Sequence, residues 1–357
     1  MPENPDNNRS LVQLLSIDPA HYARQITLVE IEKFRSISPN ELKSMKWTGQ
    51  EKEKFAPNIV ASTRWFNQIN FWVQKEILTC EELPIRTNVL SHFICIAEQL
   101  VVLNNLYSAM AVMSALQTEC IYRLKHTWNN LPNGHKLVYK KLESFFSQKE
   151  NCKKLRDYTR NLQLPSIPYL GMYLSDLTYT NIAHPKETGG RQSAVWIRKV
   201  DAIIEPILFF QNSIFPFTKN ETIYNYLMSQ RYLDSLQRFV EADNYKLSLY
   251  LEPKVAKSVT KSTCDFNEAS MESPGKEART ATITRNCHSS NILDANIMNG
   301  KVTQTPVSNL SLSDLDDYPT KEPIVAYKNG HTNIDEKPLN YKAAEKFSIE
   351  DCIDYIE

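Results

Sequence analysis

The sequence predicts an all-α fold, in which one large helical domain is followed by a disordered tail. Apolar side chains recur at every third or fourth position in one long segment, which is the spacing of a buried helix face: Val89, Phe93, Ile96, Leu100 and Leu103. Segments with the alternating pattern of a strand are nearly absent from the first 253 residues. All five tryptophans lie in that part of the chain, which is therefore expected to hold the hydrophobic core.

The same spacing predicts the helices of this domain in order along the chain. They are expected at residues 18–33, 38–45, 56–78, 89–103, 108–116, 134–146, 151–161, 169–183, 191–210, 221–229 and 233–242. The helix through 89–103 should be buried on a wide face, because a second apolar strip adjoins the first: Leu90, Ile94, Ala97 and Val101. Pro84, just before it, suits a helix start, where a backbone N–H is not needed.

Charge and cysteine content exclude several classes of protein. The chain has 357 residues with 41 basic and 41 acidic side chains, so its formal net charge is zero. A protein that binds nucleic acid by neutralising phosphates needs a positive field, so no nucleic-acid partner is expected. The seven cysteines form no CxxC pair and predict neither a disulfide framework nor zinc ligands. We therefore expect reduced thiols and a cytoplasmic protein.

No membrane-spanning segment is expected, and no cofactor. The longest uncharged stretch, residues 99–118, contains several polar side chains, which favours a buried helical region. A phosphate-binding GxxxxGKS/T loop and an HExxH metal motif are both missing. The acidic cluster of Asp314, Asp316 and Asp317 lies among serines of the polar tail, so we interpret it as a solvated patch and expect no metal site.

The domain is expected to cover residues 12–253. We expect disorder at residues 1–11 and in the Ser/Thr-rich tail 254–357, because such segments bury too little apolar surface to offset their ordering entropy. One stretch of the tail, residues 341–357, differs from the rest. Three isoleucines there have helical spacing: Ile349, Ile353 and Ile356. This stretch is either a helix that forms against a partner or a frayed acidic terminus.

Composition and spacing alone leave the function open among a binding module, a scaffold and a metal-free enzyme. The motif PSIPYLGMYLSDL at residues 165–177 narrows the choice. It resembles the signature of the catalytic domain of Ras-family guanine-nucleotide exchange factors (Ras-GEFs). Further blocks similar to this family occur in the right order, at residues 25–30, 56–58, 103–105, 114–116, 122–124 and 245–253.

The resemblance covers about residues 12–253 and looks closest to the Ral-directed branch of the family. Members of that branch also carry a pleckstrin-homology domain and an SH3-binding motif, neither of which we recognise here. The resemblance implies an exchange factor that acts without covalent chemistry and therefore is not an enzyme in that sense. Its expected partner is a Ras-family small GTPase, most similar to Ral. Membrane association is expected only indirectly, where the GTPase is lipid-anchored.

The family implies a mechanical device, a protruding helical hairpin that is inserted beside the switch region of the GTPase. Here the hairpin maps to residues 169–210, with a first helix over 169–183, a turn at 184–190 and a second helix over 191–210. Pro185 and the pair Gly189 and Gly190 suit a sharp reversal of the chain.

Site residues are carried over from the family one position at a time. On the hairpin, the residues implied to act in exchange are Tyr169, Ser175, Thr178, Asn181, Ile182 and Lys199. In the body of the domain, the residues implied to grip the second switch of the GTPase are Arg64, Met110, Gln117 and Tyr122.

An alternative from another functional class remains, a GTPase-binding adaptor that has lost exchange activity. The family often places a carboxylate near the phosphate site, where this chain has Asn181 and Ile182. Electrostatic exclusion of phosphate is then not available, and steric blockage would have to suffice. Pro206 is also expected to kink the second hairpin helix. A helical metal-dependent enzyme is a third and poorly supported interpretation.

Overall fold

The computed structural model describes residues 14–184 and 192–254. The expectations for residues 1–11, for most of the hairpin turn and for the tail beyond residue 254 lie outside these described residues.

The described part of the chain is built from helices, as the sequence predicts. They are α2 (Pro19–Ser36), α3 (Pro39–Ser44), α4 (Lys52–Phe55), α5 (Pro57–Leu78), α6 (Leu83–Val102), α7 (Leu106–Leu116), α8 (Glu119–Tyr122), α9 (Lys125–Asn130), α10 (Asn133–Phe145), α11 (Lys149–Arg160), α12 (Leu170–Ala183), α13 (Ala194–Phe210), α14 (Glu221–Ser229), the 3-10 helix η1 (Asp234–Leu236) and α15 (Gln237–Leu251). An isolated bridge between Asn105 and Ile167 is the β-type pairing recorded within the described residues.

Helix starts follow the local chemistry of the sequence. A proline stands in the first turn of α2, α3, α5 and α6, where its missing N–H costs nothing. Asp18 accepts a 2.7 Å hydrogen bond from the backbone N–H of Ala20 at the start of α2. At α3, Ser38 and Glu41 form a reciprocal capping box. These caps explain why the start of most long helices was readable from the sequence.

Four elements differ from the expectation. The short helices α4, α8 and α9 were not predicted, because four to six residues are too few to show a helical period. The last predicted helix, 233–242, was wrong, since the structure has η1 followed by α15 (Gln237–Leu251). The second half of α15 was missed because the residues that it buries are polar, Asn244 and Ser248, and give no apolar stripe.

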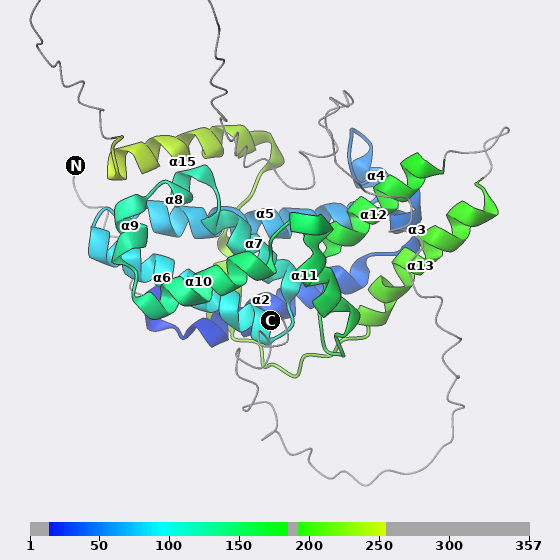
Figure 1. Cartoon of the computed structure of the whole chain (residues 1–357), viewed down its shortest axis with the longest axis horizontal. Helices are drawn as coiled ribbons and strands as arrows, with labels where there is room; N and C mark the ends of the chain where they lie inside the picture. The colour runs from blue at the N-terminus through cyan, green and yellow to red at the C-terminus, as the bar shows by residue number, and fades with distance from the viewer. Residues whose placement is uncertain (1–13, 185–191, 255–357) are drawn as a thin grey trace, which may run out of the picture.

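Helices α2, α5, α6 and α7 form the centre of the molecule and pack against one another (Figure 1). Trp65, Trp72, Tyr22 and Phe93 are among the largest side chains that are fully buried there. Helix α7 is buried over nearly its whole length, which explains the uncharged stretch at residues 99–118. None of the described helices is long and apolar enough to cross a membrane.

Helices α12 and α13 pack against each other and form the hairpin at one end of the molecule (Figure 1). The ends of the two helices near residues 184 and 192 point away from the body. Helix α13 contains Pro206 and continues to Phe210. An ion pair of 2.8 Å between Lys43 and Asp201 links α13 to α3. The hairpin therefore stands on the body at its base and projects at its tip.

Helix α15 lies along the outside of α5 and α8, at the opposite end from the hairpin tip (Figure 1). Its C-terminal end reaches α9, where Glu252 caps the helix start: the carboxylate accepts 2.9 Å hydrogen bonds from the backbone N–H groups of His126 and Thr127.

Candidate functional site

The segment that leads into α12 is fixed to the body by its backbone. Ile167 donates its N–H to the carbonyl of Asn104 (2.8 Å) and accepts from the N–H of Leu106 (2.9 Å). At the preceding residue, Ser166, the Ser213 hydroxyl accepts a hydrogen bond from the backbone N–H and donates one to the backbone carbonyl, both at 2.8 Å. The start of the hairpin and the exit from α13 are therefore held at one place. The sequence blocks 103–105 and 165–177, which lie far apart in the chain, are therefore in contact in the folded protein.

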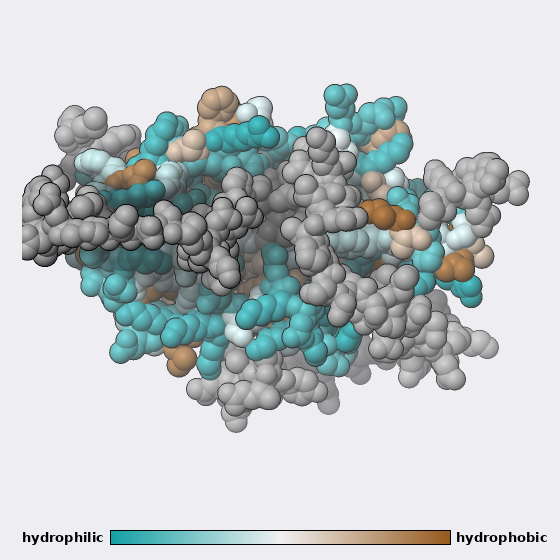
Figure 2. Space-filling model, turned by 45° about the horizontal axis from the view of Figure 1, so that its top comes forward, coloured by the Kyte–Doolittle hydropathy of each residue, from teal (hydrophilic) through white to brown (hydrophobic). Residues whose placement is uncertain are grey.

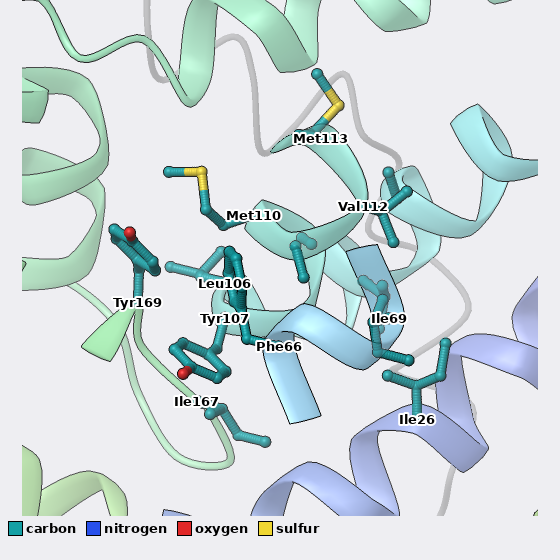
Figure 3. Close-up of a cluster of buried hydrophobic side chains, with 14 of the residues drawn as sticks. Ile26, Phe66, Ile69, Leu106, Tyr107, Met110, Val112, Met113, Ile167 and Tyr169 are labelled. Carbon is teal, nitrogen blue, oxygen red and sulfur yellow. The ribbon is translucent and has the colours of Figure 1, made fainter. Parts of the chain in front are cut away.

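Tyr169 sits at the base of the hairpin inside the core (Figure 3). Its ring centroid lies 6.1 Å from that of Tyr107 and 6.4 Å from that of Phe66. A Cβ atom at Gly171 would lie only 2.4 Å from the Tyr169 ring, so a side chain at this position has no room. The glycine of the motif is explained by this close approach, and burial raises the pKa of Tyr169.

The first half of α12 is also braced by a buried ion pair. Arg156 of α11 donates two hydrogen bonds to the carboxylate of Asp176, at 2.7 and 2.8 Å, in the bidentate arrangement. Both side chains are largely buried. The sequence analysis did not single out this pair, because its members lie twenty residues apart on different helices and nothing in the sequence links them.

From Tyr179 onward, several side chains on α12 and at the start of α13 are exposed to the solvent. Large apolar residues are exposed on both helices: Tyr179, Ile182, Val195 and Ile197. Figure 2 shows brown side chains among teal ones at this end of the molecule. Exposed apolar groups that gather at a projecting tip are typical of a protein-docking surface. The sequence analysis named only Ile182 of these four, although helical spacing could have indicated the others once the hairpin was assumed.

The predicted hairpin residues occupy different depths. Ser175 and Thr178 are half-buried, and the Thr178 hydroxyl donates to the carbonyl of Leu174 at 2.8 Å. Asn181 and Ile182 are exposed near the tip, and Lys199 is half-buried on α13. All five stand on the hairpin, and Asn181 and Ile182 are the ones most open to a partner.

Two predicted residues lie in the core instead. Tyr169 and Met110 are each 4% exposed, and Figure 3 shows Met110 pointing from α7 toward Tyr169. Neither offers much surface to a partner in this conformation. Their part in any docking would be to shape the floor beneath the hairpin, and direct contact by either residue remains a prediction.

The other body residues are exposed. Gln117 ends α7, and Tyr122 ends the next short helix, with the Lys125 ammonium 3.9 Å from the centre of its ring. Arg64 lies on α5, where its side chain contacts Glu53 of α4 and Asp234 of η1.

Arg64 is already engaged within the molecule. Its guanidinium lies 2.5 Å from a Glu53 oxygen and 3.1 Å from an Asp234 oxygen, and Lys52 lies 3.2 Å from the same Asp234 oxygen. Partial burial alone would raise the pKa of Asp234, but hydrogen bonds from Arg64 and Lys52 outweigh it and lower that pKa. A partner carboxylate would have to compete with Glu53 and Asp234 for Arg64.

A buried carboxyl lies beneath the hairpin base and was not singled out from the sequence. Glu30 on α2 is fully buried and accepts a 3.1 Å hydrogen bond from the Ser108 hydroxyl. Burial raises the pKa of Glu30 to about 8, and the hydrogen bond from Ser108 offsets part of the rise. Glu30 ends the block 25–30 that is similar to the family, but nothing in the sequence shows that its carboxyl is buried.

The described surface offers contacts on which a partner could dock. Across residues 14–184 and 192–254, no group of three or more His, Cys, Asp or Glu side chains could hold a metal ion. The Asp314, Asp316 and Asp317 cluster lies outside the described residues. What the described surface presents is an apolar projecting tip and a charged and aromatic body.

Comparisons with known proteins agree with the resemblance noted from the motif. Residues 21–201 match the RasGEF domain family. The chain is 45% identical over 243 residues to the Ras-specific guanine nucleotide-releasing factor RalGPS1 of Mus musculus, which covers 67% of this chain and 42% of that protein. It is 44% identical over 242 residues to RalGPS2 of Homo sapiens, with coverage of 67% and 42%.

A more distant relative is the Ras guanine nucleotide exchange factor Y of Dictyostelium discoideum, 33% identical over 241 residues, or 67% of this chain and 16% of that protein. The chain thus spans less than half of the length of these curated relatives. The family match alone covers more than half of the 357 residues. Motif, helical architecture and matches lead to one conclusion: the chain belongs to the RasGEF domain family.

Proposed function

We propose that this chain is a guanine-nucleotide exchange factor that promotes release of GDP from a Ras-family small GTPase, and that its substrate is Ral-like. The relatives named as guanine nucleotide-releasing factors support the activity, and the RalGPS names support the choice of Ral. In this proposal the tip of the α12–α13 hairpin is inserted beside the switch region. The observation that carries it is the exposure of four large apolar side chains at that tip.

The energetics require no covalent step. Exchange factor and nucleotide each bind the GTPase, and each lowers the affinity of the other by the same factor. The hairpin must therefore prefer a GTPase conformation whose nucleotide site is open. The hairpin can stabilise that conformation only if its own base is rigid. The buried Tyr169 ring, the Arg156–Asp176 ion pair and the Ser166–Ser213 contacts supply that stiffness.

The residues assigned to this surface keep their predicted roles within the proposal. Asn181 and Ile182 at the tip approach the nucleotide site, with Ser175, Thr178 and Lys199 behind them on the hairpin. Arg64, Gln117 and Tyr122 grip the partner from the body, over a floor that includes Met110. The GTPase is lipid-anchored in this proposal, so the cytoplasmic chain reaches the membrane only through it.

Release of a fluorescent GDP analogue tests the activity directly. The full chain is added to Ral, Rap and Ras proteins loaded with mant-GDP, and release is followed by the fall in fluorescence. We expect the fastest release with Ral. Binding to a GTPase without faster release would instead support the adaptor, the alternative favoured by the missing carboxylate at positions 181 and 182.

A matched pair of substitutions tests the hairpin. Ile182→Ala removes the apolar side chain of a tip residue that is 69% exposed, and Leu137→Ala makes the same kind of change on α10 at a residue that is 57% exposed. Loss of a central apolar contact is worth about 1.4 kcal/mol or more, so Ile182→Ala should slow release about tenfold. Leu137→Ala should leave the rate unchanged. Equal effects of the two substitutions would contradict insertion of the tip.

A second pair tests the body of the surface. Arg64→Ala and Lys52→Ala each remove a cation from Asp234, so their effects on η1 should be similar. Only Arg64 is proposed to hold the GTPase. Slower release with Arg64→Ala and an unchanged rate with Lys52→Ala are expected. If both rates fall together, the effect arises from the ion-pair network and not from a contact with the partner.

A further inference from the structure

Helix α15 is oriented opposite to an ordinary surface helix. The residues that it buries against the body are polar, Asn244 and Ser248. Its large apolar side chains point outward, with Phe239 70% and Tyr250 71% exposed and with Leu247 and Val240 also exposed. Phe239, Leu247 and Tyr250 share one side of the helix by their spacing, together with the Asp243–Lys246 ion pair. An amphipathic helix normally turns that side toward the core.

Polar contacts hold α15 along its length, and Leu251, its last residue, packs against the core. Asn244 donates to the Gln74 side chain at 3.0 Å, and Arg123 donates to the carbonyls of Ser248 and Glu252. The Glu252 carboxylate caps α9, as described above. The outward apolar residues contribute nothing to this attachment. Large apolar side chains that are exposed together on one helix are typical of a docking surface, and Figure 2 shows brown side chains among teal ones at the end of the molecule over which α15 lies.

The chain itself contains a segment with the complementary pattern. Residues 341–357 carry Ile349, Ile353 and Ile356 at helical spacing, the feature that the sequence analysis left between two interpretations. Helix α15 ends at Leu251, and the described chain ends three residues later, at Lys254. Residues 255–340 connect the two, and at about 3.3 Å per extended residue they can reach any point of a helix that is about 22 Å long.

Charge also favours this pairing. Residues 341–357 contain five acidic and two basic side chains. On α15, Lys246 lies on the same side as Phe239 and Tyr250, and Arg238 and Lys254 are exposed near the two ends of the helix. Lys246 forms a 3.0 Å ion pair with Asp243, an exposed pair that a new acidic neighbour can rearrange at little cost.

We propose that residues 341–357 form a helix that docks on the outward face of α15 in the same molecule. The isoleucines at 349, 353 and 356 pack against Phe239, Leu247 and Tyr250, and acidic residues beside them meet the basic ones. Covalent connection favours this occupant over a free partner, because docking of a linked segment is intramolecular and its effective concentration is set by the linker and not by the protein concentration. The proposal concerns the chain alone and does not depend on exchange activity.

Photo-crosslinking in the full chain tests it. The photoreactive amino acid p-benzoylphenylalanine replaces Leu247, and crosslinked peptides are identified by mass spectrometry after irradiation. The same amino acid in place of Leu137, exposed on α10, is the matched control. An equal mixture of isotopically light and heavy protein separates crosslinks within one molecule from those between two. We expect light–light and heavy–heavy products that join position 247 to residues 341–357, and none from position 137.

A pair of tail variants makes the result specific. Ile349→Asp combined with Ile353→Asp should reduce the crosslink yield at least about fivefold, since the docked isoleucines supply the apolar contact. Ile324→Asp makes the same kind of change elsewhere in the tail and should leave the yield unchanged. Mixed light–heavy products would overturn the proposal in favour of a second copy of the chain. Absence of any crosslink from 247 to 341–357, or equal yields in both variants, would also overturn it.

Discussion

Helices α12 and α15 have nearly the same length, 14 and 15 residues, and bury opposite kinds of side chain. Helix α12 buries a run of apolar residues in its first half, together with Asp176 and Thr180. Helix α15 buries only Asn244 and Ser248. The first helix is held by packing and the second by hydrogen bonds. Substitution of buried apolar residues should therefore destabilise α12, and loss of polar contacts should destabilise α15, although both helices lie on the outside of the same core.

The hairpin base is thus part of the core, whereas α15 is an attachment to it. A wedge gains from the first arrangement, because close packing resists deformation. A docking platform gains from the second, because its apolar side chains stay available. The predictions below test this contrast, in order of decreasing expected effect.

The largest difference is expected from one substitution made on each helix. Leu174 of α12 is fully buried, and Leu247 of α15 is 42% exposed. Leu174→Ala should lower the free energy of unfolding by about 2–5 kcal/mol, because it leaves a cavity. Leu247→Ala should cost less than about 1 kcal/mol, because little apolar area is lost to water. Urea denaturation of the two variants measures this, and similar losses would remove the contrast between the helices.

The carboxyl of Glu30 should make the hairpin base sensitive to pH. Its pKa is about 8 in the folded chain, above its ordinary value near 4.5, because burial disfavours the charged form. The folded state therefore binds more protons than the unfolded state in this window, and stability is lost as pH rises from about 4.5 to about 8. Between pH 6 and pH 8 the loss should be on the order of 2 kcal/mol.

Glu30→Gln provides the control for this titration, because the amide keeps the shape and cannot ionise. Its stability should change less between pH 6 and pH 8 than that of the unsubstituted chain. Denaturation curves at several pH values measure both proteins. Parallel pH profiles would show that another group is responsible.

Polar attachment of α15 predicts a local effect at its C-terminal end. Glu252→Ala removes the acceptor for two backbone N–H groups of α9 and leaves Arg86, 3.8 Å away, without that carboxylate. We expect a cost of about 2 kcal/mol and faster amide hydrogen exchange in α9 and α15 than in α12. Glu241→Ala, on the same helix but outside these contacts, is the comparison. Exchange that speeds up equally in all helices would mean that α15 is a full part of the core.

The last prediction tests the fit between Tyr169 and Gly171. Gly171→Ala should cost about 1–3 kcal/mol, because the new methyl group overlaps the Tyr169 ring. Gly134→Ala is the control, since a Cβ there meets nothing within 4 Å and alanine is the better helix former. Thermal unfolding can compare the two. In a Tyr169→Ala background the cost of Gly171→Ala should largely vanish, and a cost that persists would exclude the ring as its cause.

Much of the fold was predictable from the sequence, because long helices with apolar stripes and proline or serine starts have strong local signals. Helices α5 and α6 are examples, since Pro57 and Pro84 mark their first turns and the burial follows the spacing. Motif 165–177 located the hairpin for the same reason, as its residues are adjacent in the chain. Local signals fail for α8, which has only four residues.

The candidate site was harder to predict, because depth is a property of the whole fold. Tyr169 and Met110 look like contact residues in a motif and prove to be buried, while Tyr179 and Val195 look like core residues and are exposed. Periodicity identifies a helix face but not what lies opposite it. Pairs such as Arg156 with Asp176 and Glu30 with Ser108 join distant segments, and only the folded chain brings them together.

The double hydrogen bond between Ser166 and Ser213 has a consequence for motion of the hairpin. It joins the chain just before α12 to the chain just after α13, so the two helices of the hairpin are held together at their base. Separation of the two helices at their base would break both hydrogen bonds at once. Rotation of the hairpin as one rigid body would leave both intact. Such a rotation would act on the junction between α6 and α7, where the backbones of Asn104 and Leu106 are hydrogen-bonded to Ile167.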